Sequence, residues 1–153
     1  MLVKELTSLE ILNYIPQKPP FRFIDQIDYM NDNEICGNYT FKENEFFYKG
    51  HFPNKPITPG VILLESMCQI GVVAFGIYLL SKNIPCNEVN NWLTMFTDAK
   101  VEFLKSVLPG EKVKIIARKN FWRRMKLSSH IEMYNQQEAL IATALASGVG
   151  ILR

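Results

Sequence analysis

The sequence predicts an α+β fold in which a curved antiparallel sheet packs around one long central helix. Residues 61–80 are almost wholly apolar, over a length that suits a single buried helix. After residue 83 the sequence changes to the alternation of apolar and polar residues that is typical of strands. No linker or repeat divides the 153 residues, so we expect residues 1–153 to form a single domain. A sheet packed on the helix is the simplest two-layer arrangement for such elements.

The N-terminal region begins with a short helix. Thr7-Ser8-Leu9-Glu10 has the pattern of a capping box, a hydroxyl cap with Glu three residues later. Pro16, Pro19 and Pro20 end this helix, because proline cannot continue it. Two strands should follow at residues 21–30 and 35–41, since a turn sequence, Asn31-Asp32-Asn33, separates them.

The apolar stretch at residues 61–80 could also be a membrane-spanning helix, because about 20 residues cross a bilayer. Glu65 and Gln69 argue against this, since a carboxylate inside a membrane costs about 2.5–3.5 kcal/mol. Gly71 and Gly76 interrupt the stretch, and no basic and aromatic flanks frame both of its ends. We therefore expect a core helix surrounded by sheet and no membrane span.

The C-terminal half should form an antiparallel meander. Val113, Ile115 and Ala117 alternate with charged residues, which indicates a half-exposed strand. Strands are expected at residues 91–103, around 113–118, at 127–134 and at 140–152. Turns are expected at residues 108–111 and 135–137.

Charge and cysteine content exclude several function classes. The net charge of +2 is too small to imply a nucleic-acid or membrane partner. Cys36, Cys68 and Cys86 form neither a CxxC pair nor a zinc-binding spacing, and no metal site is expected. Residues 1–5 lack the pattern of a signal peptide, so a reducing cytoplasm is the expected location.

The segment that leads into the long helix carries the chemistry. His51 lies in a loop rich in proline and glycine, and Glu65 follows fourteen residues later inside the apolar stretch. Pro59-Gly60 starts the helix, which leaves the N–H groups of Gly60 and Val61 free to bind a ligand. A base, a buried acid and free N–H groups are the parts needed for acid–base chemistry on an acyl group.

An ordered block of motifs in this segment resembles the FabZ-type 3-hydroxyacyl-[acyl-carrier-protein] dehydratases. It comprises His51-Phe52-Pro53, Lys55-Pro56, Pro59-Gly60-Val61 and Glu65-Ser66-Met67-Cys68-Gln69, with Asn44-Glu45-Phe46-Phe47 upstream and Leu108-Pro109-Gly110-Glu111 downstream. The resemblance implies the hot-dog fold, which agrees with the sheet and helix derived above. It also implies a homodimer or a trimer of dimers with active sites at the dimer interface, and a dehydration that needs no cofactor.

The resemblance assigns a role to each residue of the site. His51 takes the C2 proton of a 3-hydroxyacyl thioester, and Glu65, whose pKa burial should raise, protonates the leaving hydroxyl. The N–H groups of Gly60 and Val61 hold the thioester oxygen. Gln69, at i+4, orients Glu65. Phe52 and Pro59 complete the expected substrate-binding residues.

Structural roles are the alternatives for the same residues. His51 could satisfy a turn, Glu65 could pair with a cation at an interface, and Gln69 could simply pack. His130, the other histidine of the chain, alternates with Ile131 on a strand and is expected to be structural.

Other activities stay open beside the dehydratase. One is a hot-dog thioesterase, and another is a non-catalytic acyl-binding partner subunit of a dehydratase. The second is suggested by Gln17-Lys18-Pro19, where the family usually has His-Arg-Tyr, and by Asn54, where it usually has glycine. A dehydratase that also isomerises the double bond usually carries Asp where Glu65 stands.

One basic cluster remains to be explained. It consists of Arg118, Lys119, Arg123, Arg124 and Lys126, interleaved with aromatic residues. Acyl-carrier proteins are acidic, so the cluster could dock the carrier. Nucleic-acid binding and a solvated hairpin turn are the alternatives.

Overall fold

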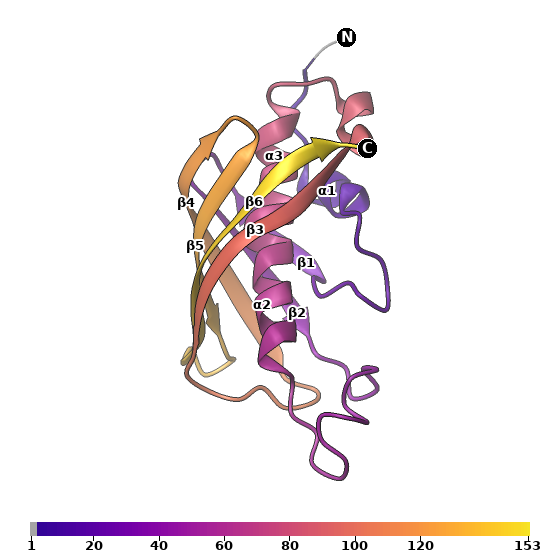
Figure 1. The fold of residues 1–153 in the computed structure, drawn as a ribbon, viewed down its shortest axis with the longest axis vertical. Coiled ribbons are helices and arrows are strands. Elements are labelled where there is room, and N and C mark those ends of the chain that lie inside the picture. Colours follow the sequence, from indigo (N-terminus) through magenta and orange to yellow (C-terminus); the bar gives the residue numbers. More distant parts are fainter. Residues whose placement is uncertain (1–2) are drawn as a thin grey trace.

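The computed structural model describes residues 3–153. Met1 and Leu2, which belong to the segment 1–5 that was searched for a signal peptide, lie outside the described residues. One long helix runs through a curved sheet (Figure 1). The elements in chain order are α1 (Ser8–Tyr14), β1 (Gln26–Met30), β2 (Glu34–Thr40), α2 (Gly60–Cys68), the π-helical η1 (Gln69–Ala74), α3 (Phe75–Ser81), the 3-10 helix η2 (Cys86–Asn91), β3 (Trp92–Phe103), β4 (Lys112–Arg123), β5 (Lys126–Tyr134) and β6 (Leu140–Leu152).

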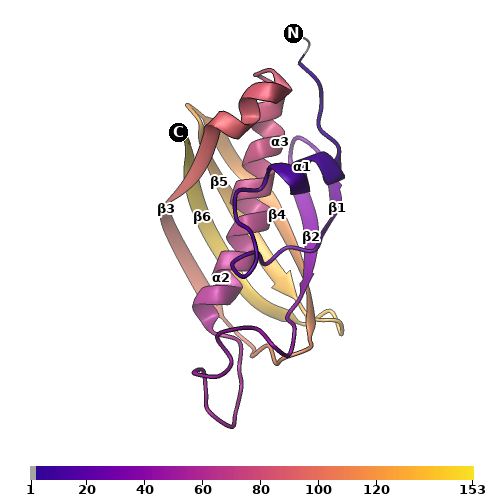
Figure 2. The ribbon, with the colours of Figure 1, turned by 90° about the vertical axis from the view of Figure 1, so that its right-hand side faces the viewer.

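The sheet has six strands in the order β1-β2-β4-β5-β6-β3, and all neighbours are antiparallel. It curves around the central helix, and α1 lies on the side of the helix away from β5 (Figures 1 and 2). This arrangement is the hot-dog fold, so the predicted fold class is confirmed.

The predicted meander is correct for β4, β5 and β6 but wrong for β3. That strand pairs with β6, from Trp92 opposite Leu152 to Phe103 opposite Ala142, and so lies at the far edge of the sheet. Alternation of apolar and polar residues determines which face of a strand is buried, but it does not determine which strand lies beside it.

The central helix is a core helix. Gly60–Ser81 spans 22 residues with a mean hydropathy of 1.9, which is enough to cross a membrane, but 78% of its most apolar window is buried inside the fold. Gly71 allows this close packing, since a Cβ there would lie 2.6 Å from Cδ1 of Ile131 and 2.9 Å from Cβ of Ala117. The π-helical turn η1 in the middle of the helix was not predicted.

The N-terminal region confirms the cap and corrects the first strand. Thr7 accepts a hydrogen bond from the N–H of Glu10, and the Glu10 carboxylate accepts one from the N–H of Thr7. The strand predicted at residues 21–30 begins only at Gln26. Before that point the N–H of Phe23 donates to the side chain of Gln69, so the backbone bonds to the helix instead of a neighbouring strand.

Candidate active site

The loop that precedes the central helix is held in place by backbone and hydroxyl hydrogen bonds. The N–H of His51 donates to the carbonyl of Phe47, and the N–H of Thr58 donates to the carbonyl of Val107. The hydroxyls of Tyr48 and Thr58 lie 2.7 Å apart, and both side chains are buried. These bonds position His51 beside the start of α2. The start of α2 lies at the lower end of the molecule in Figures 1 and 2.

The loop holds the imidazole of His51 through one of its two ring nitrogens. Its Nδ1 lies 2.9 Å from the carbonyl oxygen of Ile57. A carbonyl can only accept a hydrogen bond, so Nδ1 carries the proton and Nε2 keeps its lone pair. The ring of Phe52, joined to His51 by a cis peptide bond, stacks on the imidazole with 4.1 Å between ring centroids. The predicted base is therefore oriented, with Nε2 as the atom that can take a proton.

His51 and the helix start line one open hollow of about 400 Å³. The Phe103 ring forms part of its wall and lies so close to Gly60 that a Cβ there would be 3.1 Å from the ring. The other lining residues are Ile57, Thr58, Leu63, Leu104, Lys105 and Ser106. Sequence reasoning named His51 and Gly60 but missed Phe103, which comes from a strand more than forty residues away.

The start of α2 offers two free N–H groups. Pro59 is the N-cap residue, and its carbonyl already accepts from the N–H groups of Ile62 and Leu63. The N–H groups of Gly60 and Val61 have no acceptor within residues 3–153. The Val61 side chain is 73% exposed, whereas Pro59 is buried. The predicted site for an anionic oxygen is thus sterically open.

Glu65 is a half-buried acid. Burial raises its pKa above the ordinary value, and the hydrogen bond from Gln69 partly opposes that rise. No cation contributes to the shift, and Glu65 forms no ion pair in the described part of the chain. Burial without a neighbouring cation favours the neutral carboxyl, which is the form that can donate a proton.

Gln69 holds Glu65 in position. Its Nε2 donates to Oε1 of Glu65 at 2.8 Å and to the carbonyl of Phe21 at 3.1 Å, while its Oε1 accepts from the N–H of Phe23 at 2.7 Å. Ser66 adds a bond of 2.7 Å to the carbonyl of Phe23. The Gln69 side chain is fully buried and bonded within the protein, which fits orientation of Glu65. Sequence reasoning found the i+4 contact but missed the partners in the Phe21–Phe23 segment.

The structure of one chain does not bring every predicted residue together. His51, Gly60 and the helix start share the hollow, but Glu65 and Gln69 do not line it. Glu65 faces the Phe21–Phe23 segment through Gln69. Phe52 stacks beside His51 and is half exposed. The chain therefore presents the predicted base, His51, and the predicted acid, Glu65, in two separate places.

The basic cluster lies at the other end of the molecule from His51. It occupies β4 and the β4–β5 turn, at the end of the sheet where α3 finishes (Figure 1). Arg118 is bonded to Glu132 at 2.8 Å, and Lys126 lies 3.4 Å from Asp98. Arg123 and Arg124 at the turn are exposed and have no carboxylate partner within residues 3–153.

Comparison with known proteins identifies the family. The model of the FabA-like domain matches residues 15–144. A relative from Syntrophobacter fumaroxidans, a 3-hydroxyacyl-[acyl-carrier-protein] dehydratase FabZ, is 34% identical over 140 residues, which cover 88% of this chain and 90% of the relative. The chain belongs to the FabZ-type dehydratases of the hot-dog superfamily. A FabZ from Geobacter metallireducens is 36% identical over 69% of this chain and 68% of its own.

Solved structures support the fold of this FabZ-type chain. A thioesterase from Haemophilus influenzae matches with a TM-score of 0.69 and 15% identity, covering 97% of this chain and 93% of the other. A mutant thioesterase from Pseudomonas aeruginosa also matches with a TM-score of 0.69 and 9% identity, covering 98% of this chain and 97% of the other. Identities this low show a common fold and do not indicate thioesterase activity.

One departure from the FabZ pattern has a conformational explanation. Asn54 stands where the family usually has glycine, and its φ is 65°, in the left-handed region that glycine favours. Asparagine is among the residues that adopt this conformation most readily, so it can take the place of glycine in the loop after His51. The side-chain oxygen of Gln17, at a second departure, is buried and has no hydrogen-bond partner among the described residues.

Proposed function

We propose that this protein eliminates water from a 3-hydroxyacyl thioester on acyl-carrier protein, to give the trans-2-enoyl thioester in fatty-acid biosynthesis. The observation that carries the proposal is the match to FabZ over 90% of the relative's length. The presence of both His51 and Glu65 at the matching motif positions supports catalysis and argues against a non-catalytic partner subunit.

Each group of the site has one role in the proposed elimination. Nε2 of His51 takes a proton from C2, the C2–C3 double bond forms, and the C3–O bond breaks. The neutral carboxyl of Glu65 gives its proton to the leaving hydroxide, so that water departs. The N–H groups of Gly60 and Val61 stabilise the negative charge that develops on the thioester oxygen. A proton then returns from His51 to Glu65, which restores both residues.

We also propose that the complete site forms between two subunits of a homodimer. The separation of Glu65 from the hollow of His51 supports this arrangement. The edge strand β3 offers a surface for pairing, because it is long, has a free edge and exposes Met95 and Phe96. Assembly of such dimers into a trimer of dimers is part of the same proposal.

A double variant at the edge strand tests the dimer. Met95→Asp with Phe96→Asp should give a monomer by light scattering and remove turnover, because the base and acid would lose their partners. Glu88→Gln, an exposed change in η2, should leave both properties unaltered. A fully active monomer would rule out a site shared between subunits.

We propose that acyl-carrier protein docks on the exposed part of the basic cluster. Arg123 and Arg124 have no carboxylate partner among the described residues. Arg118 and Lys126 are paired with carboxylates. Lys119, the remaining residue of the cluster, follows Arg118 on β4. Arg123→Glu with Arg124→Glu should raise KM for carrier-bound substrate and leave a pantetheine substrate unaffected. Equal KM changes for both substrates would contradict docking at this turn.

We propose further that residues 1–153 work as one domain and that the protein acts in the cytoplasm. The three cysteines are free within the described fold, and Cys36 and Cys68 are buried, which fits a reducing compartment.

Product analysis tests the activity. Purified protein with a 3-hydroxyacyl thioester should produce the conjugated enoyl thioester, measured by ultraviolet absorbance. A thiol reagent in the same reaction should detect no free thiol. Thiol release would indicate a thioesterase, and binding without either product would indicate a non-catalytic subunit.

A further inference from the structure

The loop that carries His51 is bonded mainly to itself. The N–H of Ile57 donates to the carbonyl of His51 at 3.0 Å, and Nδ1 of His51 bonds back to the carbonyl of Ile57 at 2.9 Å. Within this pair, the N–H groups of Phe52 and Lys55 donate to each other's carbonyls at 3.1 and 3.0 Å. Residues 52–56 at the tip are exposed, and the loop between β2 and α2 protrudes at the lower end of the molecule (Figures 1 and 2). The groups that orient the loop therefore lie at its base.

Two buried hydroxyls join the two sides of this base. Tyr48 precedes His51 by three residues, and Thr58 directly follows Ile57. Their hydroxyl oxygens lie 2.7 Å apart, and the residues are only 5% and 3% exposed. A hydrogen bond in such a place cannot be replaced freely by water, so loss of one hydroxyl leaves the other without its partner. The bond therefore fixes the incoming side of the loop against the outgoing side.

The peptide group between Ile57 and Thr58 connects the hydroxyl bond to the imidazole. A peptide group is planar, so its C=O and its N–H can only turn together. Its C=O, from Ile57, accepts from Nδ1 of His51, and its N–H, from Thr58, donates to the carbonyl of the buried Val107 at 2.9 Å. The Thr58 side chain restrains the same group from a further direction, through Tyr48. The carbonyl that faces the imidazole is thus held by bonds on both sides of the loop.

The direction of this carbonyl decides which nitrogen of His51 carries the proton. A neutral imidazole has one N–H and one lone pair, and a carbonyl opposite Nδ1 favours the form with the proton on Nδ1. In the other tautomer the proton would occupy Nε2, the atom that must accept the C2 proton in the proposed reaction. Histidine in the wrong tautomer is known to lower kcat strongly in enzymes that use it as a base. Fixing the carbonyl therefore affects the rate as well as the shape of the loop.

We propose that Tyr48 and Thr58 are positioning residues, whose hydroxyl pair holds His51 in the Nδ1–H tautomer through the carbonyl of Ile57. The inference rests on the proposed dehydratase function and adds two residues that act through the imidazole rather than on the substrate. Loss of the pair should therefore lower kcat and leave KM nearly unchanged.

Nuclear magnetic resonance of the imidazole nitrogens tests the tautomer directly. The chain has two histidines, so a His130→Ala background leaves the ring of His51 as the only signal. At alkaline pH the 15N frequencies show which nitrogen carries the proton, and the parent protein should have it on Nδ1 alone. Tyr48→Phe and Thr58→Val each remove one hydroxyl with little change of shape. Both variants should show a mixture of the two tautomers.

Steady-state kinetics measures the consequence for catalysis. Tyr48→Phe and Thr58→Val should each lower kcat about 5-fold or more, the factor that corresponds to a typical hydrogen bond. The double variant should be no slower than the slower single variant, because both changes remove the same bond. Thr58→Ser keeps the hydroxyl and should retain one tautomer and most of the rate. Tyr78→Phe, which removes another buried tyrosine hydroxyl at the far end of the central helix, is the matched control.

The two measurements separate this proposal from the proposed function. Folded variants that keep the Nδ1–H tautomer, or that keep the parent kcat, would overturn the positioning role. Losses that add in the double variant would show that the two hydroxyls do not act as a pair. If the tautomer changes as expected but even the parent protein forms no enoyl product, the proposed function fails and the control of the tautomer by Tyr48 and Thr58 stands.

Discussion

The two halves of the central helix differ in how they are packed. The first half, α2, is bonded by polar groups: Ser66 donates to the Phe23 carbonyl, and Glu65 is held through Gln69, the next residue after α2. The second half, α3, borders an enclosed apolar cavity at Gly76. The polar contacts fix the direction of the Glu65 carboxyl, whereas the apolar surroundings of α3 leave space beside Gly76. One buried helix thus combines a half held by hydrogen bonds with a half that is packed less tightly.

The largest effect is expected from the reacting groups. His51→Ala or Glu65→Gln should lower kcat by at least about 10²-fold, the usual contribution of a positioned acid or base. His130→Ala and Glu88→Gln, which change exposed residues of the same types, should retain activity. Steady-state kinetics on a short 3-hydroxyacyl thioester provides the measurement. Near-normal kcat in either active-site variant would remove that residue from the mechanism.

Loss of the polar contacts should cost stability as well as rate. Gln69→Leu leaves the buried Phe23 N–H without its acceptor, at about 1–3 kcal/mol, and removes the donor to the carbonyl of the exposed Phe21. It also frees Glu65 to rotate, so kcat should fall as well. Urea unfolding gives the free energy, and Gln136→Leu on an exposed turn is the control. A variant as stable as the wild type would show that these bonds contribute nothing net.

The raised pKa of Glu65 predicts a specific dependence of stability on pH. The folded state favours the neutral carboxyl, because burial raises its pKa above that of the unfolded chain. This contribution is complete below the unfolded pKa of about 4.3 and is lost as the pH rises through the folded pKa. Glu65→Gln cannot ionise, so its stability relative to the wild type should increase from about pH 4 to about pH 8. Urea unfolding across this range provides the measurement, and a constant difference would mean that the carboxyl titrates normally.

Local sequence patterns predicted the elements but not all of their partners. The capping box at Thr7, the long buried helix and the strand that contains Val113 and Ile115 are confirmed, because each depends on neighbours within a few residues. The pairing of β3 with β6 was missed, since strand neighbours depend on the whole sheet. The strand predicted at residues 21–30 begins only at Gln26, because the Gln69 amide, 46 residues away from Phe23, bonds to the backbone before it.

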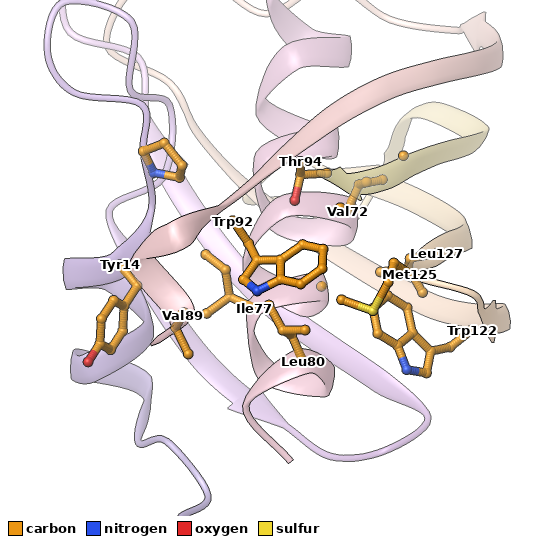
Figure 3. A pocket seen from close by; sticks show the side chains of 14 residues that line it. Tyr14, Val72, Ile77, Leu80, Val89, Trp92, Thr94, Trp122, Met125 and Leu127 are labelled. Carbon is orange, nitrogen blue, oxygen red and sulfur yellow. The ribbon is translucent and has the colours of Figure 1, made fainter. Parts of the chain in front are cut away.

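The site was predictable to the same extent. His51, Glu65 and the i+4 bond of Gln69 to Glu65 follow from a continuous segment of sequence. The apolar cavity beside α3 was not predicted, because its lining comes from the N-terminal segment, the helix and four of the strands (Figure 3). Trp92 and Trp122 carry no local pattern that would place them at one cavity. Only the folded sheet brings them there.

The smallest expected effects compare two glycines of the same helix. Gly71→Ala places a Cβ within 2.6 Å of the Ile131 side chain and should destabilise the fold by about 1–3 kcal/mol, the cost of overpacking. Gly76→Ala meets only contacts of 3.9 Å and beyond, and alanine is a better helix former by about 0.5–1 kcal/mol, so this variant should be slightly more stable. Urea unfolding of the two variants side by side measures the opposite signs. If both variants were destabilised equally, the helix would be packed as tightly at Gly76 as at Gly71, and the cavity beside α3 would be filled in solution.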